Sequence, residues 1–388
     1  MVNTQTNNPY YCPLIFHGMR VEKIDRQKFK ISACCINTPG PVIDQVDFDH
    51  DEYLQQQREL VRAHKQVPGC ERCNSNTNTS MKLAAIENFS RLSLTPDQPT
   101  LTKLDWNVDP ICNARCVQCS SYFSSAWAAE DQAHGKTSQV RLTNNTRHNT
   151  VVDQIDFGHV TAVYFDGGEP MLSSDPVEIL KRIDAVGNIS SVQLSLNTNG
   201  SVRPSAEFVE LLSKCQSVTI NFSIDGIGTE FEYIRNPLSW ATIEQNIQWW
   251  NSQSMPNLNL NVAFTLGVHN IDIVDRTHNW FADLSLVHKK MSNFNIQPCH
   301  GILSFDYSSQ DLKQIWAKKF SIPNSFSSTI QRILENSSSV DNDTAWQAHF
   351  EMIDQRRNTN WKKCLPELYK SLARANYESL KKSQGLLP

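Results

Sequence analysis

The stretch Cys112-Asn-Ala-Arg-Cys116-Val-Gln-Cys119 follows directly after the apolar segment Leu104–Val108. We expect that segment to be a β-strand, because short apolar runs bounded by turn residues are typical of buried strands. The CxxxCxxC spacing places three thiolates on one short loop. Iron–sulfur clusters usually have four cysteine ligands, so three thiolates would bind three irons of a cubane and leave the fourth iron open. Half of a zinc site is the alternative, because zinc sites commonly combine paired cysteines into a set of four ligands.

Short apolar segments alternate with longer amphipathic ones through the middle of the chain. The expected strands are Leu104–Val108, Val160–Phe165, Val192–Leu196, Val218–Ile224, Leu258–Leu266 and Phe294–Gln297. The expected helices include Pro176–Val186, Ala206–Lys214 and Trp240–Trp250. This alternation predicts an α/β fold with a parallel sheet and right-handed crossovers. We therefore expect a partial (βα)6 TIM-like barrel over residues 101–304, with its active site at the carboxyl ends of the strands.

The two flanking segments have a different character. Residues 1–100 have weak hydrophobic patterning and several cysteines, and predict a small Cys-rich domain with one helix near residues 49–65. A core this small needs additional stabilisation, which a bound metal cluster would supply. Residues 305–388 predict a helical C-terminal extension with a Ser/Asn-rich break at 336–342.

The composition excludes several classes of protein. Hydrophobic residues make up 39% and charged residues 20% of the 388 residues, as in globular proteins. The formal net charge of −4 argues against a nucleic-acid-binding scaffold. No apolar run is long enough to span a membrane, and the N-terminus has no secretory pattern, so we expect a cytoplasmic protein. In that compartment, clustered cysteines favour metal or redox chemistry over disulfides.

Polar motifs end the next three expected strands. They are Gly167-Gly168-Glu169-Pro170, Leu196-Asn197-Thr198-Asn199-Gly200 and Ser223-Ile224-Asp225-Gly226. With the CxxxCxxC loop, these motifs make residues 100 to 300 resemble the radical S-adenosylmethionine (SAM) superfamily. The resemblance implies that Cys112, Cys116 and Cys119 hold a [4Fe–4S] cluster whose open iron binds SAM. It also implies that an electron from the cluster cleaves SAM to a 5′-deoxyadenosyl radical.

The resemblance implies further cofactor contacts at the strand ends. These residues are Gly167, Gly168, Glu169, Pro170, Asn197, Thr198, Ser223, Asp225, Arg235 and Val268. Arg235 would pair with a carboxylate of SAM or of the substrate. From the residues alone, the motifs could also be ordinary Gly- and Asn-rich turns, and Arg235 could form a surface salt bridge. Cys299, after the sixth strand, is either a hydrogen-atom donor or a buried small hydrophobic residue.

A second set of cysteines precedes the barrel. Cys12, Cys35, Cys70 and Cys73 could complete an auxiliary [4Fe–4S] cluster, with Cys34 as the alternative to Cys35, or could bind zinc. The segment resembles the twitch domain, the shortened relative of the SPASM domain that carries auxiliary clusters. In most such enzymes the auxiliary domain follows the barrel, whereas here it precedes it.

These resemblances imply an enzyme that abstracts hydrogen from a peptide or a small-molecule substrate. The auxiliary cluster would favour a net oxidation, and a flavodoxin or ferredoxin would be the electron donor. Three alternatives stay open: a non-catalytic iron–sulfur or zinc protein, an epimerase that uses Cys299, and an RNA-modifying enzyme. The absence of a basic excess counts against the last.

Overall fold

The computed structural model describes residues 8–24, 28–37, 39–74, 89, 95, 98–137, 151–321, 324–338, 340 and 343–384. Its centre is a nine-stranded sheet with the order β3-β2-β1-β4-β5-β6-β7-β8-β9. The strands are β1 (Gly18–Lys23), β2 (Phe29–Ser32), β3 (Val42–Ile43), β4 (Lys103–Asn107), β5 (Ala162–Asp166), β6 (Gln193–Thr198), β7 (Ser217–Ser223), β8 (Leu258–Leu266) and β9 (Met291–Pro298). All pairs from β1 through β4 to β9 are parallel, and only β2 and β3 are antiparallel to their neighbours.

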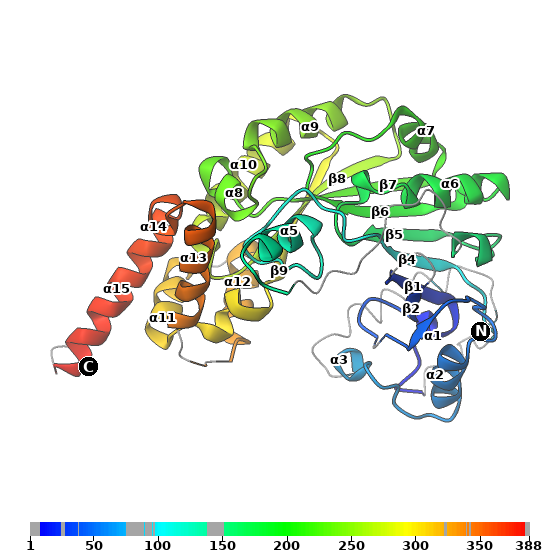
Figure 1. The fold of residues 1–388 in the computed structure, drawn as a ribbon, viewed down its shortest axis with the longest axis horizontal. Helices are drawn as coiled ribbons and strands as arrows, with labels where there is room; N and C mark the ends of the chain where they lie inside the picture. Colours follow the sequence, from blue (N-terminus) through cyan, green and yellow to red (C-terminus); the bar gives the residue numbers. More distant parts are fainter. Residues whose placement is uncertain are drawn as a thin grey trace.

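The α-helices fall into three groups along the chain. The N-terminal group is α1 (Pro13–His17), α2 (Glu52–Arg62) and α3 (Glu71–Asn74). The helices that follow the barrel strands are α5 (Ser125–Ala133), α6 (Asp175–Ala185), α7 (Ala206–Lys214), α8 (Gly228–Ile234), α9 (Trp240–Ser252) and α10 (Val274–Val287). The C-terminal group is α11 (Gln310–Lys319), α12 (Ser325–Glu335), α13 (Asp343–Arg357), α14 (Trp361–Cys364) and α15 (Pro366–Ser383). Figure 1 shows α6, α7, α9 and α10 on the outer side of the strands.

The predicted α/β barrel is confirmed, because each expected strand forms within a few residues of its predicted bounds. Alternation explains why: along β7, Val218, Ile220 and Phe222 are fully buried while the intervening residues are half-buried. The buried side belongs to the main hydrophobic core, which also contains residues of α6 and α7. The polar side faces away from this core.

The sheet continues across the predicted domain boundary near residue 100. β1 pairs in parallel with β4, from Gly18 beside Lys103 to Glu22 beside Asn107. β1 thereby brings charged side chains to the edge where the barrel strands end. Lys23 Nζ lies 3.1 Å from Asp109 Oδ1 and 3.7 Å from Asp175 Oδ2. The division into domains stays a prediction, but the N-terminal strands are part of the same sheet.

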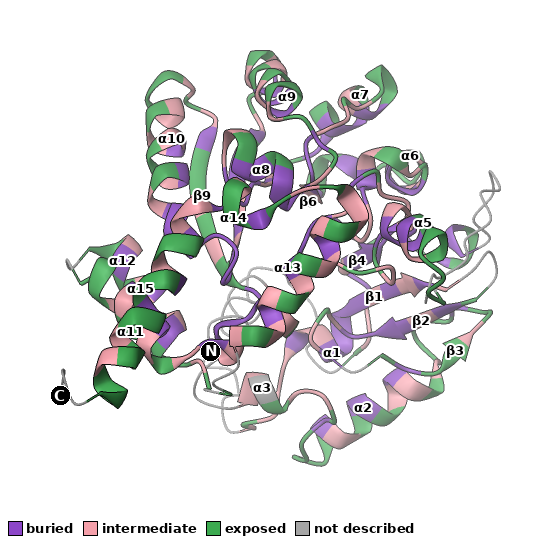
Figure 2. Ribbon diagram, turned by 60° about the vertical axis from the view of Figure 1, so that its left-hand side comes forward, coloured by how far each residue is buried: buried purple, intermediate pink, exposed green. Residues whose placement is uncertain are grey.

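The C-terminal helices form a separate layer at the other end of the molecule from α1 and α2 (Figure 1). The break predicted at 336–342 lies between α12 and α13. Each helix buries one face, as the alternating colours along α13 show in Figure 2, and Trp346, Phe350 and Trp361 are fully enclosed. Among the described residues, no helix is long and apolar enough to cross a membrane.

Candidate active site

The loop with Cys112, Cys116 and Cys119 connects β4 to α5, and neighbouring elements hold its backbone. The Trp127 indole on α5 donates to the Cys116 carbonyl at 2.8 Å. The Val117 amide donates to Ile234 O at 2.8 Å, and the Val117 carbonyl lies 2.8 Å from Nε2 of His349 on α13. The loop is therefore fixed from three sides by α5, by the end of α8 and by the C-terminal extension.

Nitrogen donors approach two of the three sulfur atoms. The Ala114 amide lies 3.4 Å from Cys112 Sγ, and Nη1 of Arg235 lies 3.7 Å from Cys116 Sγ. Burial, followed by the neighbouring cysteines, raises the pKa of Cys112 to about 11 and that of Cys119 to about 12. The free thiols therefore hold their protons at neutral pH, and metal must displace these protons when it binds.

The Gly-Gly-Glu-Pro turn after β5 packs directly on the loop after β4. The Glu169 amide donates to Ile111 O at 2.8 Å. The Glu169 carboxylate is fully buried and accepts from Thr198 Oγ1 at 2.7 Å and from the Asn199 amide at 2.6 Å. Burial raises the pKa of Glu169, and these donors oppose that shift. The structure thus brings the β5 and β6 motifs together, with the Asn199 side chain 3.9 Å from Cys112 Sγ.

Asp225 and Arg235 form a buried ion pair beside the cysteine loop. Arg235 Nη2 lies 2.5 Å from Asp225 Oδ2, and Asp225 Oδ1 accepts from the Thr265 amide at 2.7 Å. Arg235 is 7% exposed and Asp225 is fully buried, so this pair is not the surface salt bridge that the sequence left open. The structure therefore joins the β7 motif to Cys116.

The remaining predicted residues of the barrel occupy neighbouring strand ends. Val268 is fully buried after β8, and Cys299 is 5% exposed after β9. Burial raises the pKa of Cys299 to about 12, so its sulfur keeps its hydrogen. Asn197 donates to the Tyr164 hydroxyl at 2.6 Å, and Ser223 is half-buried at the end of β7. Their contacts with a cofactor stay predictions.

The N-terminal part of the chain has a small separate core of Ile15, Phe16, Ala33, Val61 and Val67. Cys12 and Cys70 pack against this core.

Cys34 and Cys35 face different surroundings. Burial, followed by the thiolates of Cys34 and Cys73, raises the pKa of Cys70 to about 11. The pKa of Cys35 is also raised to about 11, first by desolvation and then by Asp105, although solvent still reaches its side chain. Cys34 is thus near enough to Cys70 to raise its pKa, whereas Cys35, the residue preferred from the sequence, is influenced by Asp105 of β4.

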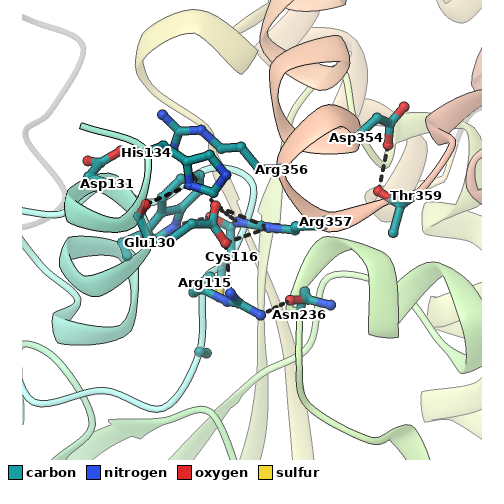
Figure 3. Close-up of polar contacts among 12 residues, drawn as sticks. Arg115, Cys116, Glu130, Asp131, His134, Asn236, Asp354, Arg356, Arg357 and Thr359 are labelled. Carbon is teal, nitrogen blue, oxygen red and sulfur yellow. Dashed lines mark hydrogen bonds and ion pairs between the residues drawn. The ribbon is translucent and has the colours of Figure 1, made fainter. Parts of the chain in front are cut away.

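A polar network around Glu130 was not predicted from the sequence (Figure 3). Glu130 on α5 lies 2.8 Å from Nη1 of Arg115 and 3.1 Å from Nε of Arg357, and Arg356 bonds Asp131 at 2.8 Å. Arg115 lies inside the cysteine loop, whereas Arg356 and Arg357 end α13. No local signal could reveal this network, because its members are far apart in the sequence.

The polar face of the sheet was also missed. Asn293 donates to Asn261 at 3.3 Å, Asn261 donates to Asn221 at 3.1 Å, and Asn221 donates to Ser195 at 3.1 Å. These amide and hydroxyl side chains carry no charge. This polar face could have been predicted from the sequence, because polar residues recur at every second position along each strand.

The residues at the cysteine loop fit an iron–sulfur cluster. Three thiols share one loop, and N–H groups point at two of their sulfur atoms, where they would stabilise thiolate ligands. A Cβ atom at Gly168 would lie 2.4 Å from Ile111 O, so only glycine allows the two loops to meet. Within the described ranges, no three His, Cys, Asp or Glu side chains form a group that could hold a single metal ion.

The chain is similar to several known proteins. The GTP 3′,8-cyclase of Lactiplantibacillus plantarum is 26% identical over 168 residues, which cover 43% of this chain and 47% of that protein. The chain thus matches about half the length of this relative. The solved structure of anSMEcpe with bound AdoMet has a TM-score of 0.40 and 16% identity, covering 62% of this chain and 63% of that one. Streptococcus suis SuiB bound to S-adenosylmethionine has a TM-score of 0.39 and 14% identity, covering 86% and 74%.

The family model of the Radical SAM superfamily matches residues 106–280, which include the cysteine loop and the motifs after β5, β6 and β7. A [4Fe–4S] cluster and SAM are the cofactors of this superfamily. Residues 106–280, less than half of the chain, are therefore similar to radical SAM domains.

Proposed function

We propose that this protein is an enzyme that abstracts a hydrogen atom from a peptide or small-molecule substrate. The observation that carries the proposal is the convergence of Cys112, Cys116 and Cys119 with the buried Glu169 and Asp225 at one edge of the sheet. When bound, the cluster and SAM supply the chemistry, a one-electron cleavage that yields a 5′-deoxyadenosyl radical.

The chain's own residues would hold and orient the two cofactors. The three thiolates would bind the cluster, and the two glycines of the β5 turn let its backbone pack against the loop after β4, where the amino group of SAM would bind. Glu169 fixes Asn199 and Thr198 in place through its three hydrogen bonds with the β6 motif and Met171. Val268 and the half-buried Asn197 and Ser223 would complete the contacts along the strand ends.

The row of uncharged polar side chains on β6 to β9 favours a substrate with many hydrogen-bonding groups. Asn221, Asn261 and Asn293 form a row that begins beside Ser195 and crosses the neighbouring strands. Amide side chains both donate and accept, as peptide groups do, so this surface matches a peptide chain. We place the substrate against this face, next to the cysteine loop.

The N-terminal cysteines support a second, auxiliary cluster. As its ligands we propose Cys12, Cys70, Cys73 and either Cys34 or Cys35, with the influence of Cys34 on the pKa of Cys70 supporting Cys34. An auxiliary [4Fe–4S] cluster held there would supply one-electron redox chemistry, which suits a net oxidation. Metal analysis separates this proposal from a zinc site: about eight irons per chain are expected, and zinc in their place would contradict it.

The decisive experiment is anaerobic reconstitution with iron and sulfide, reduction by dithionite and addition of SAM. The wild-type protein should release 5′-deoxyadenosine, measured by liquid chromatography and mass spectrometry, whereas the Cys112→Ala/Cys116→Ala/Cys119→Ala protein should release none. Cys215→Ala is the matched control, since Cys215 caps α7 at the opposite end of the strands. Equal product from the triple variant would refute the site. Reduced flavodoxin or ferredoxin can then replace dithionite as the electron donor.

A further inference from the structure

The three cysteines of the SAM-cluster loop have unequal electrostatic surroundings. Cys116 is 8% exposed, and a buried guanidinium, that of Arg235, lies 3.7 Å from its sulfur. Cys112 receives a neutral backbone amide, and the Cys119 thiol donates to the Ser120 carbonyl at 3.7 Å. Among the described hydrogen bonds to these three sulfur atoms, only the one to Cys116 therefore comes from a charged group.

Asp225 holds this charge in place and partly neutralises it. The ion pair with Arg235 spans 2.5 Å, and the other carboxylate oxygen of Asp225 is fixed by the Thr265 amide. Both charges act on the Cys116 sulfur in opposite directions: Arg235 favours a negative sulfur and Asp225 disfavours it.

The reduction potential of an iron–sulfur cluster depends on net charge, on hydrogen bonds to the sulfur atoms and on solvent exposure. Reduction adds one electron to the cluster, so a nearby positive charge stabilises the reduced form and raises the potential. A buried charge acts strongly, because little solvent screens it. A carboxylate in the same place has the opposite effect.

We propose that Arg235 and Asp225 set the reduction potential of the cluster bound by Cys112, Cys116 and Cys119, with Arg235 raising it and Asp225 limiting the rise. This inference rests on the proposed function, since it needs the cluster. Arg235 would influence the reduction potential through the Cys116 sulfur, and this effect would be present before SAM binds. A contact with the SAM carboxylate alone would leave the SAM-free potential unchanged.

The test is a potentiometric titration of the reconstituted protein without SAM, followed by electron paramagnetic resonance. The signal is assigned to this cluster by its loss in the Cys112→Ala/Cys116→Ala/Cys119→Ala protein. Arg235→Gln should shift the midpoint potential to a more negative value, and Asp225→Asn should shift it to a more positive one. Arg182→Gln is the control, because Arg182 is an exposed arginine paired with Glu178 and Asp153 on and beside α6.

The opposite signs make the outcome decisive. Unchanged potentials in both variants, or shifts in the same direction, would overturn the inference. If Arg235→Gln leaves Asp225 unpaired and the cluster is lost, the test rests on Asp225→Asn alone. The absence of a positive shift in Asp225→Asn would then refute the inference. If Arg235→Gln leaves the SAM-free potential unchanged but weakens SAM binding, measured by calorimetry, then Arg235 only pairs with the SAM carboxylate, and the inference is overturned. A wild-type protein without this cluster signal would instead refute the proposed function itself.

Discussion

His269 is a buried histidine that follows β8. It is 1% exposed, and neither ring nitrogen has a hydrogen-bond partner among the described residues. Burial lowers its pKa to about 4 from an ordinary value of 6.5. As the pH falls below 6.5, His269 becomes protonated in the unfolded chain but stays neutral in the folded chain. The free energy of unfolding therefore decreases until the pH reaches about 4.

This linkage predicts a specific acid sensitivity. Between pH 8 and pH 5.5, His269 should cost about 1.4 kcal/mol of unfolding free energy, and His269→Leu should remove that loss. Urea unfolding followed by tryptophan fluorescence under anaerobic conditions measures the difference. His159→Gln is the control, since His159 is exposed. An identical pH dependence in the wild type and in His269→Leu would show that the imidazole is protonated in the folded protein.

At the scale of elements, the close approach of two loops depends on Gly168. A Cβ atom at this position would lie 2.4 Å from Ile111 O and 2.8 Å from Asp109 O, both on the loop that leads to Cys112. Gly168→Ala must therefore push the loops after β4 and β5 apart. We expect fewer irons per chain after reconstitution and a loss of 5′-deoxyadenosine of about tenfold or more, which corresponds to about 1.4 kcal/mol.

The matched control is Gly158→Ala, whose Cβ would approach only the Asp156 side chain, at 3.2 Å. Both variants should keep the wild-type circular dichroism spectrum. Normal iron content in Gly168→Ala would mean that the loops can move apart without disturbing the three thiols.

The sequence predicts those elements whose signal is local. β8 and α7 have the predicted bounds, Leu258–Leu266 and Ala206–Lys214, because alternation and helical periodicity act over a few residues. β1 was not predicted, because its partner strand β4 lies far along the chain. Three of its six residues are charged, which is unusual for a strand inside a sheet, and the ionic partners of the two basic residues are distant in the sequence. The same limit applies to the site: motifs identified Glu169 and Asp225, whereas their partners are visible only in the folded chain.

At the scale of the whole molecule, Glu130 connects the cysteine loop to the C-terminal extension. Its carboxylate is 3% exposed and lies beside Arg115 of the loop and Arg357 of α13, while Arg356 also approaches within 3.8 Å. The Arg357 guanidinium packs 4.7 Å above the Trp127 ring, whose indole holds the Cys116 carbonyl. The extension is thus attached to the loop that carries Cys112, Cys116 and Cys119.

Removal of the Glu130 charge should therefore affect both stability and cluster retention. Glu130→Gln leaves buried guanidinium groups uncompensated, which costs about 3 kcal/mol when one partner of a buried ion pair is lost. We expect a lower urea midpoint for the whole chain, because α13 loses its ion pairs with Glu130. We also expect fewer irons per chain after gel filtration, because α13 then no longer holds the cysteine loop in place. Glu351→Gln, on the exposed side of α13, should change neither quantity. If Glu130→Gln lowers stability but retains the full iron content, the extension stabilises the fold without positioning the cysteine loop.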